Sequence, residues 1–381
     1  MTFRSIAPRL PALAALGVFT AAATAQPLPG NLPAPADAPA PPATAPAAPD
    51  VAGRPGAENA ALENEITPAL DAAISKGLEA LAAQQQPDGS FGSSNLGHNV
   101  AITSLACLAY MGDGNLPGRG RYASIVERGV EAVIANCTET GLIAAETAHG
   151  PMYGHGFATL MLGEVYGMTR GGDGTAFNQK VHESLVKAVR LIVQTQNEEG
   201  GWRYNPVPND ADVSVTICQI MALRSARNAG LEVQRSTIDR AVQYVRLCQA
   251  EDGGFRYQLG RGGSAWPRSA AGVASLYYAG IYQDQALERG LKYLNDNAMP
   301  GRNPEGGGPH YFYGHYYAVQ AMYLAGGDAW AQWWPAIREE LIQRQRPDGL
   351  WDDSSAGDAY GTAVALIILQ MPKRYLPIFQ K

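Results

Sequence analysis

The sequence predicts an all-α fold of six helical hairpins, arranged as two concentric rings of helices. A phrase of Gln, an acidic turn, Gly and an aromatic residue recurs at multiples of about fifty residues, a spacing typical of an array that reuses one supersecondary unit. The phrase occupies residues 85–91, 196–202, 249–255 and 345–351. An amphipathic segment precedes each phrase, and a more apolar segment follows it.

The N-terminal part of the chain is expected to lie outside this fold. Arg4 and Arg9 precede an apolar run at residues 10–23, and Ala23-Thr24-Ala25 has the small-residue pattern of a signal-peptide cleavage site. Residues 1–25 are therefore predicted to be a signal peptide that exports the protein to the periplasm or the extracellular space. Residues 26–61 are mostly Pro and Ala, which favours a disordered linker. A single domain is predicted for residues 62–381.

The first helix of each unit is predicted to be amphipathic and to form the outer ring. Apolar residues recur three and four positions apart, as in Ile74, Leu78 and Leu81, and charged residues fill the other faces. A helix with this pattern buries one side only. The six predicted outer helices are residues 69–86, 125–136, 181–196, 238–249, 286–297 and 331–345.

The second helix of each unit is apolar on nearly all sides and rich in small residues, which predicts a buried inner ring. The six predicted inner helices are residues 99–111, 156–168, 213–226, 269–279, 316–325 and 361–371. Strict alternation of six outer and six inner helices favours a closed ring, because closure removes the exposed apolar ends of an open stack.

The turn phrase has a structural interpretation of its own. Its Gly follows a helix end, where a left-handed residue is often required, and its aromatic residue can fold back over the helix that precedes it. Its Gln side chain can bond free backbone groups at the end of a neighbouring helix. The corresponding turns of the second and fifth units keep the Gly without the full phrase.

This phrase resembles the QW-type repeat of squalene–hopene cyclases, oxidosqualene cyclases and the β subunits of protein prenyltransferases. The resemblance covers roughly residues 61–371, with four clear phrases and two weaker ones. It implies the α/α toroid that these families share, and a squalene cyclase-like or prenyltransferase-repeat protein. Function resides in the site rather than in the fold, so the activity has to be argued from particular residues.

Polar residues recur at the start of the inner helices. Aligning these helices on their small residues brings six polar side chains to one position, each three residues before an Ala or Val: His98, His155, Asp212, Arg268, His315 and Tyr360. The alignment predicts a polar rim over an apolar well, an arrangement typical of ligand sites. The alternative is that these side chains cap free backbone N–H groups at the helix starts.

An acid motif marks one of these positions. The resemblance to squalene–hopene cyclases implies an Asp-x-Asp-Asp motif whose middle Asp protonates an alkene, and Asp210-Ala211-Asp212-Val213 has its first two acids but lacks the third. Asp212 is therefore the candidate general acid, with Asp210 and His315 as supporting catalytic groups. Arg268 could instead pair with Asp212 and keep it ionised.

Aromatic residues near the same helix starts are candidates for substrate contact. Ring faces stabilise cations, although aromatic residues that flank buried helices also serve as packing. The predicted substrate-binding residues are His98, His155, Arg268, Tyr360, Trp266, Tyr313 and Tyr316. The expected ligand is an apolar small molecule of isoprenoid or lipid type.

The sequence predicts no metal and no cofactor. The resemblance to prenyltransferases implies a zinc site with an Asp-x-Cys pair, but Asp212-Val213-Ser214 has Ser in place of the Cys. A different zinc site that uses His98, His155 and Asp212 remains an alternative, since these residue types are suitable ligands. The sequence contains no Walker phosphate loop, no Gly-x-Ser-x-Gly elbow and no His-Glu-x-x-His motif.

Two functional hypotheses follow. The first is an exported terpene cyclase-like enzyme, and the second is a non-catalytic binding or interaction module that holds an apolar ligand, lipid or peptide. A net charge of −6 and a pI near 5.6 argue against nucleic acid as a partner. No apolar run after the N-terminal segment reaches the ~20 residues that a membrane-spanning helix needs, so any membrane contact is expected to be peripheral.

Overall fold

Helices alternate between an outer and an inner position along the chain. The computed structural model describes residues 65–93, 96–145, 147, 150–169, 175–302 and 310–380, which belong to one compact unit, Gly53–Lys381. The predicted signal peptide (1–25) and linker (26–61) lie outside the described residues. Within those residues the regular structure is helical, and no β-strand is present.

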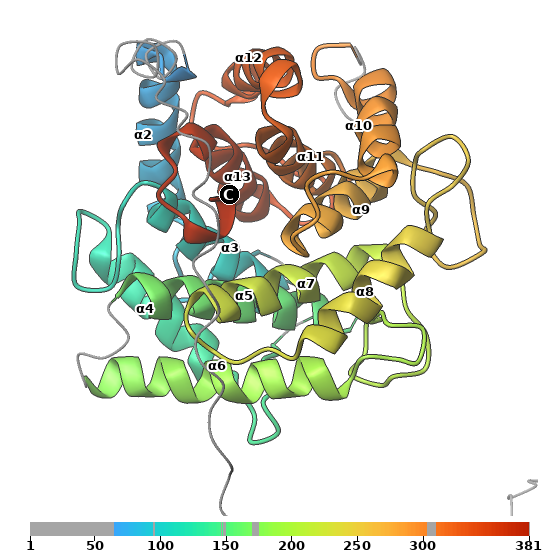
Figure 1. Ribbon diagram of the computed structural model, residues 1–381. Coiled ribbons are helices and arrows are strands. Elements are labelled where there is room, and N and C mark those ends of the chain that lie inside the picture. The colour runs from blue at the N-terminus through green and yellow to red at the C-terminus, as the bar shows by residue number, and fades with distance from the viewer. Residues whose placement is uncertain are drawn as a thin grey trace, which may run out of the picture. The chain divides into compact units, whose positions relative to one another are not determined.

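Helices at the periphery of this unit surround other helices that lie inside them (Figure 1). The outer helices are α2 (Pro68–Ala82), α4 (Ala123–Ala135), α6 (Ala176–Gln194), α8 (Arg235–Leu247), α10 (Gln285–Ala298) and α12 (Gly327–Arg344). The inner helices are α3 (Val100–Gly112), α5 (Met152–Met168), α7 (Val213–Asn228), α9 (Trp266–Tyr278), α11 (Tyr311–Ala325) and α13 (Asp358–Leu369). The predicted all-α fold of six helical hairpins is confirmed.

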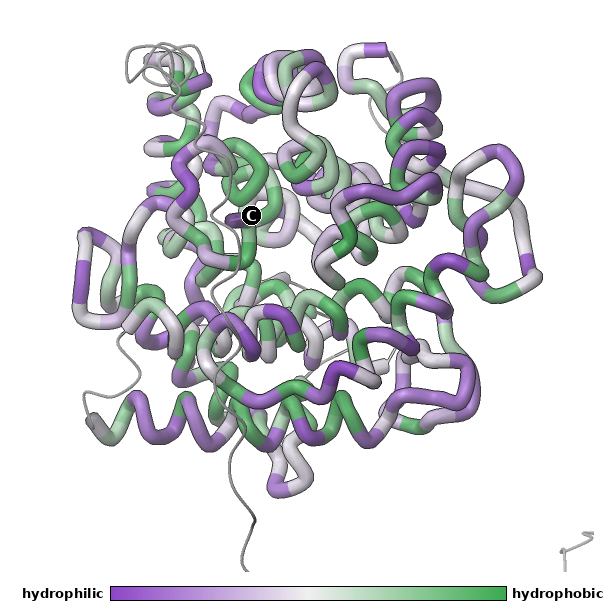
Figure 2. Tube along the Cα trace, viewed as in Figure 1, coloured by the Kyte–Doolittle hydropathy of each residue, from purple (hydrophilic) through white to green (hydrophobic). Residues whose placement is uncertain are grey.

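The inner helices form a closed ring. Each contacts the next in chain order, from α3 through α5, α7, α9 and α11 to α13, and α13 contacts α3. Figure 2 shows the inner helices as largely apolar, while the outer helices alternate polar and apolar residues. Every residue of α3 except Ala101 is buried, whereas α2 buries only one side. None of the described helices combines the length and apolar character needed to span a bilayer.

Small residues allow the inner helices to approach one another closely. A Cβ atom at Gly156 would lie 2.7 Å from the Cβ of Cys218, and one at Gly163 would lie 2.4 Å from the Oγ of Ser225. Both contacts join α5 to α7. The small residues that characterise the inner segments in the sequence are therefore explained by helix packing.

The four Gln residues of the turn phrases join successive outer helices. In each case Nε2 donates to the carbonyl of the turn Gly and to a carbonyl near the start of the next outer helix, at 2.7–3.0 Å. These residues are Gln85, Gln196, Gln249 and Gln345. Gln345 donates to the carbonyl of Ala73 on α2, so it connects the last unit to the first.

The turn Gly is required for two reasons, which Gly200 illustrates. Its φ of 99° is a left-handed conformation, and a Cβ atom there would lie 2.4 Å from the backbone oxygen of Arg240 on α8. The aromatic residue folds back as expected, because the indole Nε1 of Trp202 donates to the carbonyl of Ile192 on α6 at 2.8 Å. The same contact joins Trp351 to α12.

Candidate functional site

The six polar residues aligned in the sequence do not share one structural position. In five units, the backbone N–H of the residue two positions after the turn Gly donates a hydrogen bond to a side chain near the start of the inner helix. This hydrogen bond identifies the equivalent position in each unit. The acceptors are Thr103, His155, Thr216, Ser269 and Thr362. His155 therefore corresponds to Thr and Ser in the other units, whereas Asp212, Arg268 and Tyr360 do not occupy this position. The prediction of a single polar rim was wrong in its register.

His155 has a structural role. Its Nδ1 accepts from the N–H of Ile143 at 3.2 Å, so Nε2 carries the proton and donates to the carbonyl of Ala188 at 3.2 Å. Complete burial lowers the pKa of His155 to about 4, and the ring is neutral at pH 7. Both ring nitrogens are occupied, so His155 is not available to a metal or a ligand.

The structure does not assemble the alternative zinc site. His98 is half exposed, and its Nδ1 lies 2.8 Å from a carboxylate oxygen of Asp88. Within the described ranges, no three His, Cys, Asp or Glu side chains are arranged to hold a metal ion. Tyr360, another residue of the aligned set, does not line the pocket described next.

A pocket of about 610 Å³ opens at the N-terminal ends of α5, α7, α9 and α11. We call it the aromatic pocket. Its lining residues are Tyr153, Tyr204, Ser214, Tyr257, Ala265, Trp266, Pro267, Arg268, His310 and Tyr313. Three of the predicted substrate-binding residues are among them: Arg268, Trp266 and Tyr313. Apolar surface predominates in this lining.

The space beneath the aromatic pocket is filled by side chains that meet across the ring. Phe157 on α5 packs edge-on against Tyr316 on α11, with ring centroids 5.9 Å apart. The Tyr317 hydroxyl lies 3.3 Å from the Sγ of Cys218 on α7. Tyr316 is only 2% exposed and is not among the lining residues, so its predicted contact with substrate is not supported. In place of the expected apolar well, these buried side chains from α5, α7 and α11 pack against one another.

Two loop tyrosines that were not predicted form one wall of the pocket. The hydroxyl groups of Tyr204 and Tyr257 are hydrogen-bonded to each other. Their backbone carbonyls accept from the first N–H groups of α5 and α7, which positions both loops. The guanidinium of Arg203 lies 4.7 Å from the ring centroid of Tyr204 and 5.3 Å from that of Tyr257. The sequence signal was present, because Gly-Gly-Trp-Arg-Tyr at 200–204 and Gly-Gly-Phe-Arg-Tyr at 253–257 extend the phrase in two consecutive units.

Asp212 caps α7 and is fully buried. Its Oδ1 accepts from the N–H of Val215 at 2.9 Å, and its Oδ2 lies 3.6 Å from the Nε of Arg203. Burial raises the pKa of Asp212 to about 6, although the hydrogen bond from Val215 and the charge of Arg203 oppose the shift. The suggested pairing with Arg268 is wrong, because Arg268 donates to backbone carbonyls instead. Asp212 is not among the residues that line the aromatic pocket.

The other two candidate catalytic residues lie elsewhere. Asp210 is 57% exposed, and its carboxylate lies 3.4 Å from the Nη1 of Arg203. His315 is buried and lines a separate, smaller cavity of about 210 Å³. The structure therefore brings Asp210 and Asp212 together around Arg203 but does not bring His315 to them.

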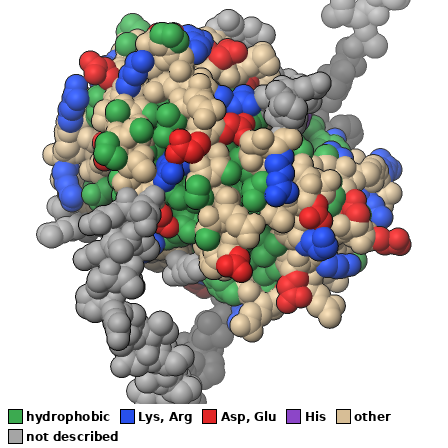
Figure 3. Space-filling view, turned by 90° about the horizontal axis from the view of Figure 1, so that it is seen from above, with side chains coloured by type: hydrophobic (Ala, Val, Ile, Leu, Met, Phe, Trp, Pro, Cys, Tyr) green, Lys and Arg blue, Asp and Glu red, His purple; other side chains and the backbone are tan. Residues whose placement is uncertain are grey.

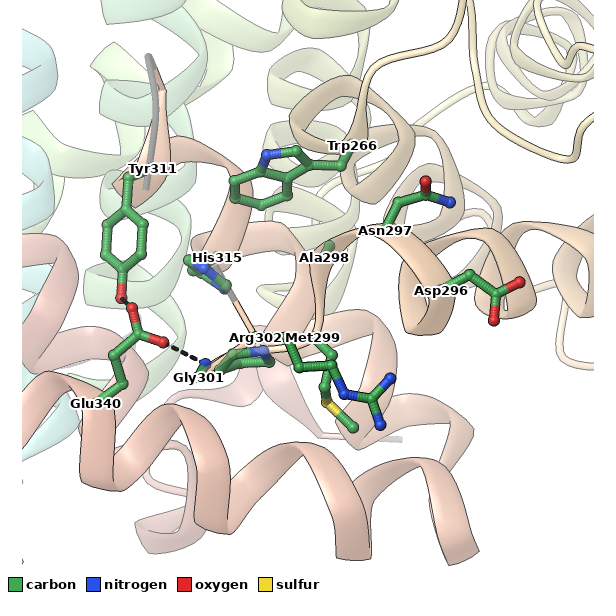
Figure 4. A pocket seen from close by; sticks show the side chains of 11 residues that line it. Trp266, Asp296, Asn297, Ala298, Met299, Gly301, Arg302, Tyr311, His315 and Glu340 are labelled. Carbon is green, nitrogen blue, oxygen red and sulfur yellow. Dashed lines mark hydrogen bonds between the residues drawn. The ribbon is translucent and has the colours of Figure 1, made fainter. Parts of the chain in front are cut away.

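Figure 4 shows the smaller cavity, where His315 lies between Trp266 and Tyr311. Burial lowers the pKa of His315 to about 4, so its ring is neutral at pH 7. Glu340 accepts from the N–H of Gly301 at 2.7 Å and from the Tyr311 hydroxyl at 2.8 Å. Both carboxylate oxygens of Glu340 therefore already accept hydrogen bonds from groups of the protein.

Charged side chains of both signs are interspersed on the face shown in Figure 3, where they lie among apolar ones. That face shows no continuous field of one charge.

No protein-family model and no curated protein matches the chain. Solved structures do match. The type II terpene cyclase MstE from Scytonema, in complex with its substrate geranylgeranyl dihydroxybenzoate, gives a TM-score of 0.53 at 14% identity and covers 81% of this chain and 98% of its own. A D-mannose isomerase gives 0.59 at 14% identity, with 81% and 98% covered. A GH76 α-mannanase from Bacteroides thetaiotaomicron gives 0.55 at 11% identity, with 80% and 96% covered.

The chain has a terpenoid cyclase-like α/α toroid fold. At these identities the likeness shows the fold alone, and the three similar proteins perform unrelated chemistry on it. The residues of the site must therefore decide between the functional hypotheses.

Proposed function

We propose that this chain is a binding protein whose aromatic pocket holds an apolar small molecule of isoprenoid or lipid type. The observation that carries the proposal is the pocket of about 610 Å³, whose walls include Tyr153, Trp266 and Tyr313. Small-molecule sites are typically about 300–1,000 Å³ in volume and mostly apolar in lining. The packed core beneath the pocket confines the ligand to the mouth of the ring.

The polar groups of the walls support an apolar ligand. Tyr204 and Tyr257 use their hydroxyls on each other, and the Tyr313 hydroxyl donates to the carbonyl of Ser214 at 3.3 Å. These tyrosines therefore offer mainly ring faces. The substrate of MstE, geranylgeranyl dihydroxybenzoate, joins an isoprenoid chain to an aromatic ring, and it belongs to the ligand class proposed for this pocket.

The test is calorimetric titration of the purified protein with geranylgeraniol and with squalene. We expect saturable binding of at least one of them, weakened about tenfold or more by Tyr313→Ala because a buried ring contact is lost. Tyr375→Ala is the matched control, since Tyr375 is half exposed and does not line the pocket. Absence of binding to both compounds would refute the proposal.

Acid-initiated cyclisation is the second candidate function, favoured by one observation. Asp212 has a pKa raised to about 6, and its Oδ2 accepts no hydrogen bond within the described residues, so a proton on that oxygen is not committed to another group. Its absence from the pocket lining argues against this function. Product analysis with squalene and prenyl diphosphates compares wild type with Asp212→Asn. A product formed equally by both would exclude Asp212 as the acid.

Export is also part of the proposal, because Arg4, Arg9 and the apolar run at 10–23 have the order of a signal peptide. Fusion of residues 1–61 to a reporter enzyme that is active only after export tests this expectation. An inactive fusion would contradict it.

A further inference from the structure

Among the described residues that line the aromatic pocket, one carries a permanent charge. Arg268 is the only Lys or Arg among its ten lining residues, and none of the ten is Asp or Glu. A guanidinium stays protonated throughout the physiological pH range. The guanidinium would therefore attract a ligand with an anionic group and repel a ligand with a cationic group.

The guanidinium of Arg268 is fixed in place. Its Nε donates to the carbonyl of Phe255 at 3.1 Å, and its Nη2 donates to the carbonyl of Gly263 at 2.6 Å. Within the described part of the chain, its Nη1 makes no hydrogen bond and no carboxylate forms an ion pair with it. Arg268 is thus oriented by backbone contacts that leave its charge unneutralised.

Arg203, the other arginine near this mouth, provides a contrast. It lies within 3.4 Å of the Asp210 carboxylate and 3.6 Å of the Asp212 carboxylate, and its face is covered by Tyr204 and Tyr257. Its charge is already compensated. Among the described residues, no carboxylate pairs with Arg268 as Asp210 and Asp212 do with Arg203, so the charge of Arg268 is available to a ligand.

We propose that the pocket selects amphiphiles with a single carboxylate, which Arg268 binds while the apolar body lies against Tyr153, Trp266 and Tyr313. This inference rests on the proposed binding function and names its ligand class. A monoanion neutralises one guanidinium, whereas a diphosphate would bring more negative charge than Arg268 compensates, near the carboxylates of Asp210 and Asp212.

The test compares geranylgeranoic acid with geranylgeraniol, which share the isoprenoid chain and differ in the head group. In calorimetric titrations at pH 7.5 the acid should bind about tenfold or more tightly, as expected for a hydrogen bond to a charged group. Equal affinities would overturn the inference while leaving the proposed function standing. Failure of both compounds to bind would refute the proposed function itself. Tighter binding of geranylgeranyl diphosphate than of the acid would overturn the single-carboxylate assignment.

Substitution of single arginines tests whether Arg268 is the residue that distinguishes the acid from the alcohol. Arg268→Met should lower the affinity for the acid about tenfold or more and so remove most of the difference between the acid and the alcohol. Arg261→Met, which removes an exposed arginine from the loop that precedes α9, should change neither affinity. If Arg268→Met weakens both ligands equally, Arg268 only supports the loop and the inference fails. The comparison of acid and alcohol on the wild-type protein needs no variant, so it decides the inference even if Arg268→Met does not fold.

Discussion

Replacing Gln345 by Ala should weaken the contact that connects the last unit of the ring to the first. The Gln345 side chain donates from Nε2 to the carbonyls of Ala73 and Gly349, both at 2.9 Å. Ala at this position removes both hydrogen bonds. The Gly349 carbonyl loses its donor, whereas the Ala73 carbonyl, which lies inside α2, keeps its intrahelical bond. The helix α12 that precedes Gln345 and the helix α2 that contains Ala73 contact each other directly, so the loss falls on the seam of the ring.

The expected loss of stability follows from these two bonds. A net contribution of about 1 kcal/mol per hydrogen bond, with a further penalty for the unpaired Gly349 carbonyl, gives about 2–3 kcal/mol. For a unit of roughly 320 residues, the usual unfolding entropy of about 2.1 cal/mol/K per residue converts this loss to a fall in Tm of about 3–5 °C.

Urea denaturation followed by far-UV circular dichroism, with calorimetry for Tm, measures the effect. Gln343→Ala is the matched control, because Gln343 is exposed on the same helix, and it should cost less than about 0.5 kcal/mol. Hydrogen exchange should accelerate first in α2 and α12. If Gln345→Ala is as stable as Gln343→Ala, the Gln contacts do not hold the ring closed and the reasoning is refuted.

Three further predictions concern a turn glycine, a buried threonine and the carboxyl group of Asp212. Gly200→Ala should cost over about 2 kcal/mol more than Gly230→Ala in urea denaturation, because both positions have positive φ but only Gly200 has a backbone oxygen within 2.4 Å of the new Cβ. Thr216→Val should cost about 1–3 kcal/mol by leaving a buried N–H unpaired, whereas Thr159→Val should cost less because its hydroxyl bonds only a carbonyl of its own helix. Since burial raises the folded-state pKa of Asp212 to about 6, its stabilising contribution is present below about pH 4 and is lost as pH rises through 6; stability measured from pH 4 to 7 should therefore rise in Asp212→Asn relative to wild type by about 2–3 kcal/mol. A difference that does not vary with pH would contradict the assigned burial.

The ring could be predicted from the sequence because its determinants are local and repeated. The alternation of helix types appears in the hydropathy pattern, and the Gly of each turn reports a left-handed residue at a helix end. Every predicted helix overlaps an observed one, although the starts differ by up to five residues. The inner helix of the third unit begins at Val213 in both, whereas α11 begins at Tyr311 rather than at the predicted residue 316. A contact of each Gln with the end of a neighbouring helix was also expected, and the acceptors lie near the start of the next outer helix.

The register of the polar residues could not be predicted in the same way. Inner helices contain small and apolar residues at most positions, so an alignment on small residues fits several registers equally well. The structure resolves the ambiguity through a long-range contact, the hydrogen bond from the N–H of Phe91, Ile143 or Trp202 to the inner helix. This contact joins residues 11 to 14 positions apart across a loop, in the five units where it is observed, and its acceptor can be Thr, Ser or His.

The repeat and its exceptions have different roles. Residues that recur in the phrase, such as Gln345 and Gly200, hold helices to one another and have no contact with the aromatic pocket. Residues that appear in only two neighbouring units, Tyr204 and Tyr257, form a wall of that pocket. Because a ring of similar units presents similar surfaces, a pocket on one side of the mouth requires units that differ from the others. The residues added to the phrase in two units, rather than the phrase itself, therefore mark the place in this toroid where we propose that a ligand binds.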